Sequence, residues 1–175
     1  LGSTSPALLP GGLAVQGGKS GVLSLLNLKK LDGTSGPARP KTGGELQTID
    51  APGRTDVFSQ PAVATTGGTT YVFVTTSAGT AAYQLSGRRL HVAWQDSTPG
   101  TSPVIAGGLL YVYDETHDAV IVRTPETGRH LASLPVGPGH WNSPIIVGGR
   151  IILPEGNAND HASTGVLDIY HLPGR

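Results

Sequence analysis

The side chains best placed to do chemistry lie in a short glycine-rich loop, residues 137–142. In it, His140, Trp141 and Asn142 follow one another just before Pro144. Trp141 could stack on a planar ligand or a sugar, and His140 could bind a ligand or act as an acid or base. The simpler interpretation, and the more common one for tryptophan, is packing at a junction of the fold, with a histidine that hydrogen-bonds backbone.

A second polar loop offers oxygen ligands at alternate positions. Glu155, Asn157 and Asn159 are spaced as the ligands of calcium loops often are. The position that an EF-hand fills with its last, bidentate acid holds Val166 here, so the loop is not an EF-hand. We therefore predict these three residues as a candidate Ca²⁺ site, with a solvated loop of Asx turns as the alternative.

Several other kinds of site are excluded by composition or by context. The chain has 12 basic and 12 acidic residues, which argues against a nucleic-acid partner held by bulk charge. It has no Cys, so thiolate catalysis, disulfides and zinc–sulfur centres are excluded. Residues 16–21 contain Gly-Lys-Ser but lead into an apolar strand pattern, unlike a phosphate-binding loop. The acidic stretch 114–118 reads as an ordinary turn, and no apolar run is long enough to span a membrane.

The elements that must position these loops repeat along the chain. Four segments begin with a proline and reach a Gly-Gly pair a few residues later. Their prolines, which lie 55, 42 and 41 residues apart, are Pro6, Pro61, Pro103 and Pro144. Short apolar and β-branched runs follow each pair, separated by Gly, Pro, Asp and Asn, and no stretch has helical periodicity.

This repeat predicts an all-β fold of four strands per unit of about 41 residues, the pattern of a β-propeller. The second run of a unit is apolar on both faces, as in residues 71–74, which favours stacked blades over a β-sandwich. We expect a single partial propeller over residues 1–175, whose last blade lacks its outer strand. The expected blades span about 3–50, 60–96, 102–135 and 143–172.

The repeat resembles those of quinoprotein-type, or PQQ-like, β-propellers. In that family a turn of the form Leu-Asp-x-x-Thr-Gly-Lys follows the third strand, and a tryptophan follows in the outer strand. Residues 124–129, Thr-Pro-Glu-Thr-Gly-Arg, match the turn, residues 31–33 match it in part, and Trp94 matches the tryptophan. The resemblance implies an extracytoplasmic protein. The family includes alcohol and sugar dehydrogenases that use PQQ and Ca²⁺, and scaffold propellers without a cofactor, such as an outer-membrane assembly lipoprotein.

Departures from the dehydrogenases decide between these two implied functions. Their adjacent cysteine pair is absent, and no run matches their cofactor-site motifs. We therefore expect a non-catalytic binding or scaffold module with no cofactor. The alternative is part of a PQQ- and Ca²⁺-dependent dehydrogenase, with Trp141 and the candidate Ca²⁺ ligands near the quinone. A hydrolase or lyase on the same propeller is a third, weaker possibility.

Strand direction predicts where a site would form. Loops between second and third strands, and those that precede each first strand, should share the face at the mouth of the central channel. Candidate ligand residues on that face are His140, Trp141, Asn142 and His161. His140 and His161 could share a metal, although no third ligand is identified. We expect a protein or a small molecule to bind there, and a second copy or further blades to complete a ring of about eight blades.

Overall fold

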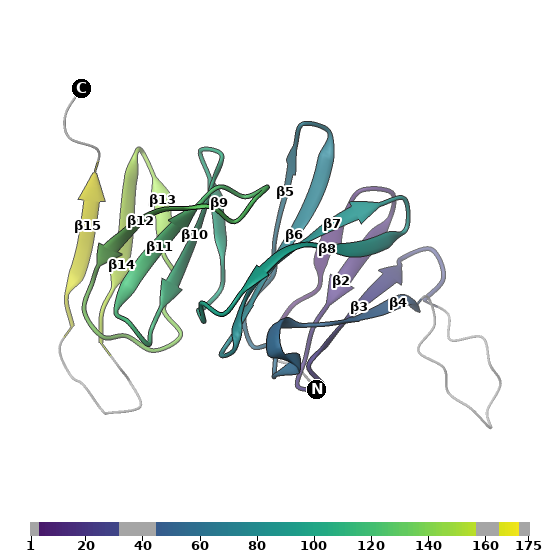
Figure 1. Ribbon diagram of the computed structural model, residues 1–175, viewed down its shortest axis with the longest axis horizontal. Helices are drawn as coiled ribbons and strands as arrows, with labels where there is room; N and C mark the ends of the chain where they lie inside the picture. The colour runs from purple at the N-terminus through teal and green to yellow at the C-terminus, as the bar shows by residue number, and fades with distance from the viewer. Residues whose placement is uncertain (1–3, 32–44, 157–164, 172–175) are drawn as a thin grey trace.

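The chain folds into successive antiparallel sheets joined in sequence order. The computed structural model describes residues 4–31, 45–156 and 165–171, and within these ranges it contains fifteen strands and one short 3₁₀ turn, Pro52–Arg54. Figure 1 shows the sheets side by side, from the purple N-terminal sheet to the yellow strand β15 at the other end. This arrangement differs from the two facing layers of a β-sandwich.

Each of the first three sheets contains four strands, and the fourth contains three among the described residues. The first sheet is formed by β1 (Ala7–Leu9), β2 (Leu13–Gln16), β3 (Val22–Asn27) and β4 (Glu45–Asp50). The second is formed by β5 (Ala62–Thr66), β6 (Thr69–Thr76), β7 (Gly79–Ser86) and β8 (Arg89–Asp96). The third is formed by β9 (Val104–Ala106), β10 (Leu109–Asp114), β11 (Ala119–Arg123) and β12 (His130–Pro135). The fourth is formed by β13 (Ile145–Val147), β14 (Arg150–Pro154) and β15 (Leu167–His171).

Within every sheet the strands pair in chain order, and the first strands of neighbouring sheets contact one another. The first strands are therefore innermost, as in propeller blades. Each first strand turns into the second through a Gly-Gly pair, for example Gly67 and Gly68 with φ of 56° and 79°. Two positive φ angles give the type I′ turn whose twist matches a hairpin, and glycine adopts them without strain. The repeated Gly-Gly pair is thus the hairpin signal of each sheet.

The second sheet shows why the sheets stack, because it is apolar on both faces. Alternate residues of β6 point to opposite sides. Val72 and Val74 pack with Val15 of the first sheet, whereas Phe73 packs with Val112 of the third. All five side chains are at most 1% exposed. A fully buried Val or Phe contributes about 1.5–3 kcal/mol, so both faces of the sheet stabilise the fold.

The third sheet is covered on both sides in the same way. Leu110 and Val112 face the second sheet, and Tyr111 and Tyr113 face the fourth, where they pack with Leu153. The Tyr113 hydroxyl donates to the carbonyl of Gly137 at 3.2 Å. Burial is the main cause that raises the pKa of Tyr113 to about 12. The phenol therefore stays protonated and keeps its donor at neutral pH.

Hydrogen bonds through buried hydroxyls link the second sheet to the segment before the third, and that segment to the one before the fourth. The Ser59 hydroxyl donates to the carbonyl of Thr75 at 2.6 Å, and the Thr75 hydroxyl donates to the carbonyl of Thr101 at 2.5 Å. The Thr101 hydroxyl continues the series with a bond to the carbonyl of Asn142 at 2.5 Å. Ser59, Thr75 and Thr101 are at most 4% exposed. These bonds join the segments that precede three successive innermost strands.

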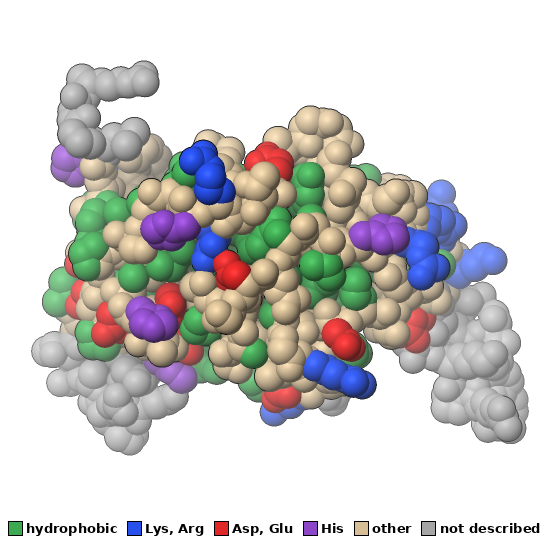
Figure 2. Space-filling model, in the orientation of Figure 1, with side chains coloured by type: hydrophobic (Ala, Val, Ile, Leu, Met, Phe, Trp, Pro, Cys, Tyr) green, Lys and Arg blue, Asp and Glu red, His purple; other side chains and the backbone are tan. Residues whose placement is uncertain are grey.

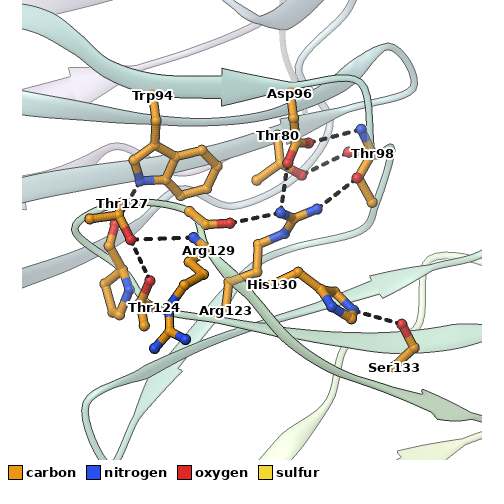
Figure 3. A network of polar contacts seen from close by, with 12 residues as sticks. Thr80, Trp94, Asp96, Thr98, Arg123, Thr124, Thr127, Arg129, His130 and Ser133 are labelled. Carbon is orange, nitrogen blue, oxygen red and sulfur yellow. Dashed lines mark hydrogen bonds and ion pairs between the residues drawn. The ribbon is translucent and has the colours of Figure 1, made fainter.

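A second set of polar contacts joins the outer parts of the second and third sheets (Figure 3). Trp94 of β8 donates through Nε1 to the carbonyl of Pro125 at 2.7 Å. Its ring lies so close to Gly128 that a Cβ there would sit 2.6 Å from the indole. Arg123 forms an ion pair with Asp96 at 2.7 Å. The outer-strand tryptophan and the turn 124–129, both singled out in the sequence, thus pack on each other.

Replacing Thr75 by valine tests the hydroxyl series. The change keeps the shape of the side chain but removes the donor to the buried carbonyl of Thr101. We expect the free energy of unfolding to fall by about 1–3 kcal/mol, measured by urea denaturation. The matched control is Thr66→Val at an exposed hairpin position, which should change stability by less than about 0.5 kcal/mol. Equal small effects of both substitutions would contradict a structural role for the series.

Candidate ligand site at the channel-mouth face

The loop with His140, Trp141 and Asn142 connects β12 to β13 and is held by its neighbours. Tyr113 bonds the carbonyl of Gly137, and the N–H of Gly156 bonds the carbonyl of Pro138 at 2.9 Å. Asn142 forms two of the hydrogen bonds that hold the loop. Its side-chain amide donates to the carbonyl of Pro154, and its backbone carbonyl accepts from the Thr101 hydroxyl. The amide of Asn142 therefore holds the loop in place.

Trp141 is the most prominent side chain of the loop. Its backbone has a φ of 61°, in the left-handed region that bulky residues rarely adopt. The indole is 52% exposed and contacts two rings edge-on, Phe58 at 5.4 Å and His140 at 5.1 Å between centroids. Non-glycine residues in this region cost about 1–3 kcal/mol and cluster at functional sites. Trp141 is thus held half-exposed at the surface, against one side of Phe58.

The two aromatic residues occupy the same position of the repeat. Phe58 and Trp141 each lie three residues before the proline that opens a unit, and Gly100 has this position in the unit between them. A Cβ on Gly100 would lie 2.2 Å from Cγ1 of Val112, so the backbone there is too close for a side chain. The absence of a side chain at Gly100 lets the two rings meet above it.

A cavity of about 240 Å³ lies beside the aromatic pair. Its lining comes from the loops β6–β7 and β10–β11 and from the segments that precede β5, β9 and β13. These are the loops that strand direction assigns to the channel-mouth face. Besides Phe58 and Trp141, the lining includes hydroxyl groups and two carboxylates, Asp56 and Glu115.

Glu115 connects the cavity to His140. The Oε2 atom of Glu115 lies 3.8 Å from Nδ1 of His140, and both side chains are about one-third exposed, at 34% and 29%. On the other side, Nζ of Lys19 lies 5.5 Å from the centroid of the Phe58 ring. The site therefore combines carboxylates with aromatic rings, one of which already has a cation against it.

Sequence reasoning did not select Asp56, Phe58 or Glu115. The acidic turn 114–118 reads as an ordinary blade turn when taken alone, and residues 56–58 carry no motif. Phe58 could have been predicted from the sequence, because it lies three residues before its proline, as Trp141 does. Asp56 and Glu115 join the site only through the stacking of the sheets.

The candidate Ca²⁺ ligands are described only in part. Asn157 and Asn159 lie outside the described residues, as does His161. Glu155 approaches the N–H of Gly137 and hydrogen-bonds the side chain of Asp168. Asp168 stands opposite Leu153 in the pairing of β14 with β15, which brings its carboxyl near the start of the loop. No group of three metal-ligating side chains occurs within residues 4–31, 45–156 and 165–171.

A second, shallower groove lies between the β8–β9 connection and the third sheet, with a volume of about 430 Å³. It contains two histidine pairs, His117 with Asp114 at 2.7 Å and His130 with Ser133 at 2.8 Å. Asp114 also accepts the N–H groups of Thr116 and His117, so its carboxylate shapes the turn. The histidine paired with the serine is not the one oriented by the carboxylate. The groove therefore lacks the connected geometry of a Ser-His-Asp triad.

Comparison with solved structures identifies the architecture. The chain is similar to the crystal structure of BamB from Moraxella catarrhalis, a β-propeller, with a TM-score of 0.69 and 17% identity over 99% of this chain. The match covers 47% of BamB, so the chain spans about half of its length. The crystal structure of the computationally designed Ika4 protein matches with a TM-score of 0.60 and 11% identity, over 98% of this chain and 91% of Ika4.

No protein-family model matches the sequence, and no curated protein matches it. At such low identities, likeness to solved structures demonstrates the fold alone. The predicted all-β propeller, whose fourth blade has three strands among the described residues, is confirmed.

The contact between Glu155 and Asp168 predicts a pH dependence of stability. The hydrogen bond with Asp168 raises the pKa of Glu155, the charges of Asp168 and Asp118 raise it further, and the Gly137 N–H opposes them. Between the ordinary pKa and the raised one, the folded protein binds more protons than the unfolded chain. Its stability should therefore fall as the pH rises through the raised pKa.

Urea unfolding at pH values from about 4 to 8 measures this effect, since it covers the range above the ordinary pKa of Glu. Glu155→Gln removes the titrating group and should flatten the fall in stability. Glu126→Gln, in the turn that follows β11, should keep the wild-type profile. If Glu155→Gln also keeps that profile, the raised pKa is wrong.

Proposed function

We propose that this protein is a non-catalytic binding or scaffold module built on a β-propeller. The observation that carries the proposal is the cavity at the channel-mouth face, where Phe58 and Trp141 meet beside Asp56 and Glu115. Aromatic rings with a few polar groups at a concave surface are typical of ligand sites. Channel-mouth loops are the parts of a propeller that vary most freely, because the strands beneath them carry the fold.

The same proposal places the protein outside the cytoplasm, among PQQ-like propellers. Its support is the resemblance of the repeat, notably residues 124–129 and Trp94, together with the propeller fold shared with BamB. Among the described residues, no helix has the length and hydrophobicity needed to cross a bilayer.

The cavity does not fit the quinone cofactor of the alternative function. PQQ is a tricarboxylate and needs cationic partners, whereas the described residues of the cavity lining include Asp56 and Glu115 and no Lys, Arg or His. Buried or half-buried charges of like sign repel one another at short range. We therefore favour the binding module over a PQQ- and Ca²⁺-dependent dehydrogenase.

Site-specific photocrosslinking in the native host tests the binding function. A photoreactive amino acid at Thr116, on the rim of the cavity, should give defined adducts. The same residue at Arg88, in the β7–β8 hairpin at the opposite end of the strands, is the matched control. Adducts at neither position, or equally at both, would contradict a binding site at this face.

A test for the dehydrogenase can be run in parallel with the intact protein. After incubation with PQQ and Ca²⁺, we expect no bound quinone absorbance and no dye-linked oxidation of alcohols or sugars. Stoichiometric quinone binding, with oxidation that a chelator abolishes, would overturn the non-catalytic proposal.

The fourth sheet presents an uncovered apolar face that we assign to contact with a second copy of the chain. Ile145, Ile152 and Ile169 form one cross-strand row, and Val147 and Leu167 lie on the same side by strand alternation. Ile145, Val147, Leu167 and Ile169 are between 51% and 58% exposed. Figure 2 shows apolar side chains gathered at the end of the molecule where this sheet lies.

The corresponding face of each earlier sheet is buried by the next sheet, as Tyr111 and Tyr113 are. At the other end of the molecule, Leu8 of the first sheet is 70% exposed and paired with Ala14. A head-to-tail pair of chains would bring this end against the fourth sheet and continue the stacking into a ring.

Light scattering of the purified chain should therefore give about twice the mass of one 17.9 kDa chain. The double substitution Ile145→Lys and Ile169→Lys puts charge on the uncovered face and should give monomers. A control with Val92→Lys and Leu131→Lys, on exposed outer strands, should keep the wild-type mass. A stable wild-type monomer in dilute buffer would contradict the proposed pairing.

A further inference from the structure

Three of the hydroxyl groups that line the cavity beside Phe58 and Trp141 already donate their protons within the protein. The hydroxyl protons of Ser59 and Thr75 are directed at backbone carbonyls, and that of Thr76 is directed at the carbonyl of Pro52 at 2.9 Å. A hydroxyl that has donated its proton can only accept a further bond. These three hydroxyl groups of the lining therefore offer no donor to a ligand.

Two backbone N–H groups of the lining also already have acceptors within the protein. The N–H of Gly100 bonds the carbonyl of Thr76 at 3.2 Å, and the N–H of Thr116 bonds Oδ1 of Asp114 at 2.9 Å. The lining also contains two carboxylates, Asp56 and Glu115, which in their ionised form can accept hydrogen bonds but cannot donate them. A ligand that supplies hydrogen-bond donors would complement these two carboxylates, and positive charge on the ligand would offset their charge.

The aromatic rings favour the same class of ligand. The face of an indole or phenyl ring attracts cations, and tryptophan does so most strongly. Phe58 already has the ammonium of Lys19 at 5.5 Å from its centroid. Among the described residues, no Lys or Arg lies over Trp141, whose ring is half exposed at the edge of the cavity.

Resting on the proposed binding function, we infer that this cavity binds a guanidinium or ammonium group, with Asp56 and Glu115 as its charge partners and Trp141 as its aromatic wall. A guanidinium combines five donors with a flat face that stacks on an indole. His140, whose Nδ1 lies 3.8 Å from Oε2 of Glu115, is a group of the protein itself that could pair with that carboxylate. The cation can come from a free small molecule or from a basic side chain of a partner protein.

Titrations followed by NMR chemical shifts test this inference. The probe is N-acetyl-L-arginine amide, and its control is N-acetyl-L-citrulline amide, which has nearly the same shape and no charge. We expect the arginine probe to bind about tenfold more tightly or better, and to shift the resonances of the cavity residues. Equal binding of the two probes, or no shift with arginine at millimolar concentration, would overturn the inference.

Matched variants locate the effect. Asp56→Asn and Glu115→Gln remove charge with almost no change in volume, and each should weaken arginine binding by about tenfold. Trp141→Ala should weaken it as well, whereas Glu126→Gln in the turn after β11 should leave it unchanged. Urea unfolding confirms that each variant remains folded. Unchanged binding in both carboxylate variants would assign the effect to another site and reject the proposal.

A third comparison separates the two sources of the cation. A peptide with arginine between glycines should bind more tightly than the free amide if the partner is a protein, because its backbone adds contacts at the rim. Equal affinities would assign the site to a small cation. Photocrosslinks at Thr116 without arginine binding would leave the binding function in place and reject only the cationic ligand.

Discussion

The second and third sheets of this protein are apolar on both faces, and neighbouring sheets cover both of those faces. Val72 and Phe73 point to opposite sides of the second sheet, and both are fully buried by different neighbours. Burial of apolar surface is the main favourable term in folding, so a sheet of this kind cannot stand alone. The same constraint explains why the sheets stack, and it is the reason for assigning a covering partner to the exposed face of the fourth sheet around Ile145 and Ile169.

Apolar packing has no preferred direction, so it does not fix how one sheet is rotated against the next. The buried hydroxyls supply that direction, because Ser59, Thr75 and Thr101 each bond a specific backbone carbonyl. These bonds lie at the end of the strands where the cavity opens. The cavity therefore has a rigid base, and a rigid base can hold Trp141 at a positive φ that an isolated loop would avoid.

The sequence was sufficient to predict the strands and their grouping, because these depend on local signals. A Gly-Gly pair with two positive φ angles marks a hairpin wherever it occurs. The cavity depends on contacts between units, so Asp56 and Glu115, 59 residues apart, could not be paired from spacing alone. The partner of Glu155 was missed for the same reason, since the pairing of β14 with β15 places Asp168 beside it.

The candidate site arises where the repeats differ from one another. The prolines, the Gly-Gly pairs and the apolar runs recur because every sheet needs them. The position three residues before the last three of these prolines differs between units, and it holds Phe58, Gly100 and Trp141 in turn. Val112 excludes any side chain at Gly100, so the two rings meet across the middle unit and leave space beside them. Variation at a single position of the repeat thus turns the end of a stack of sheets into a concave surface.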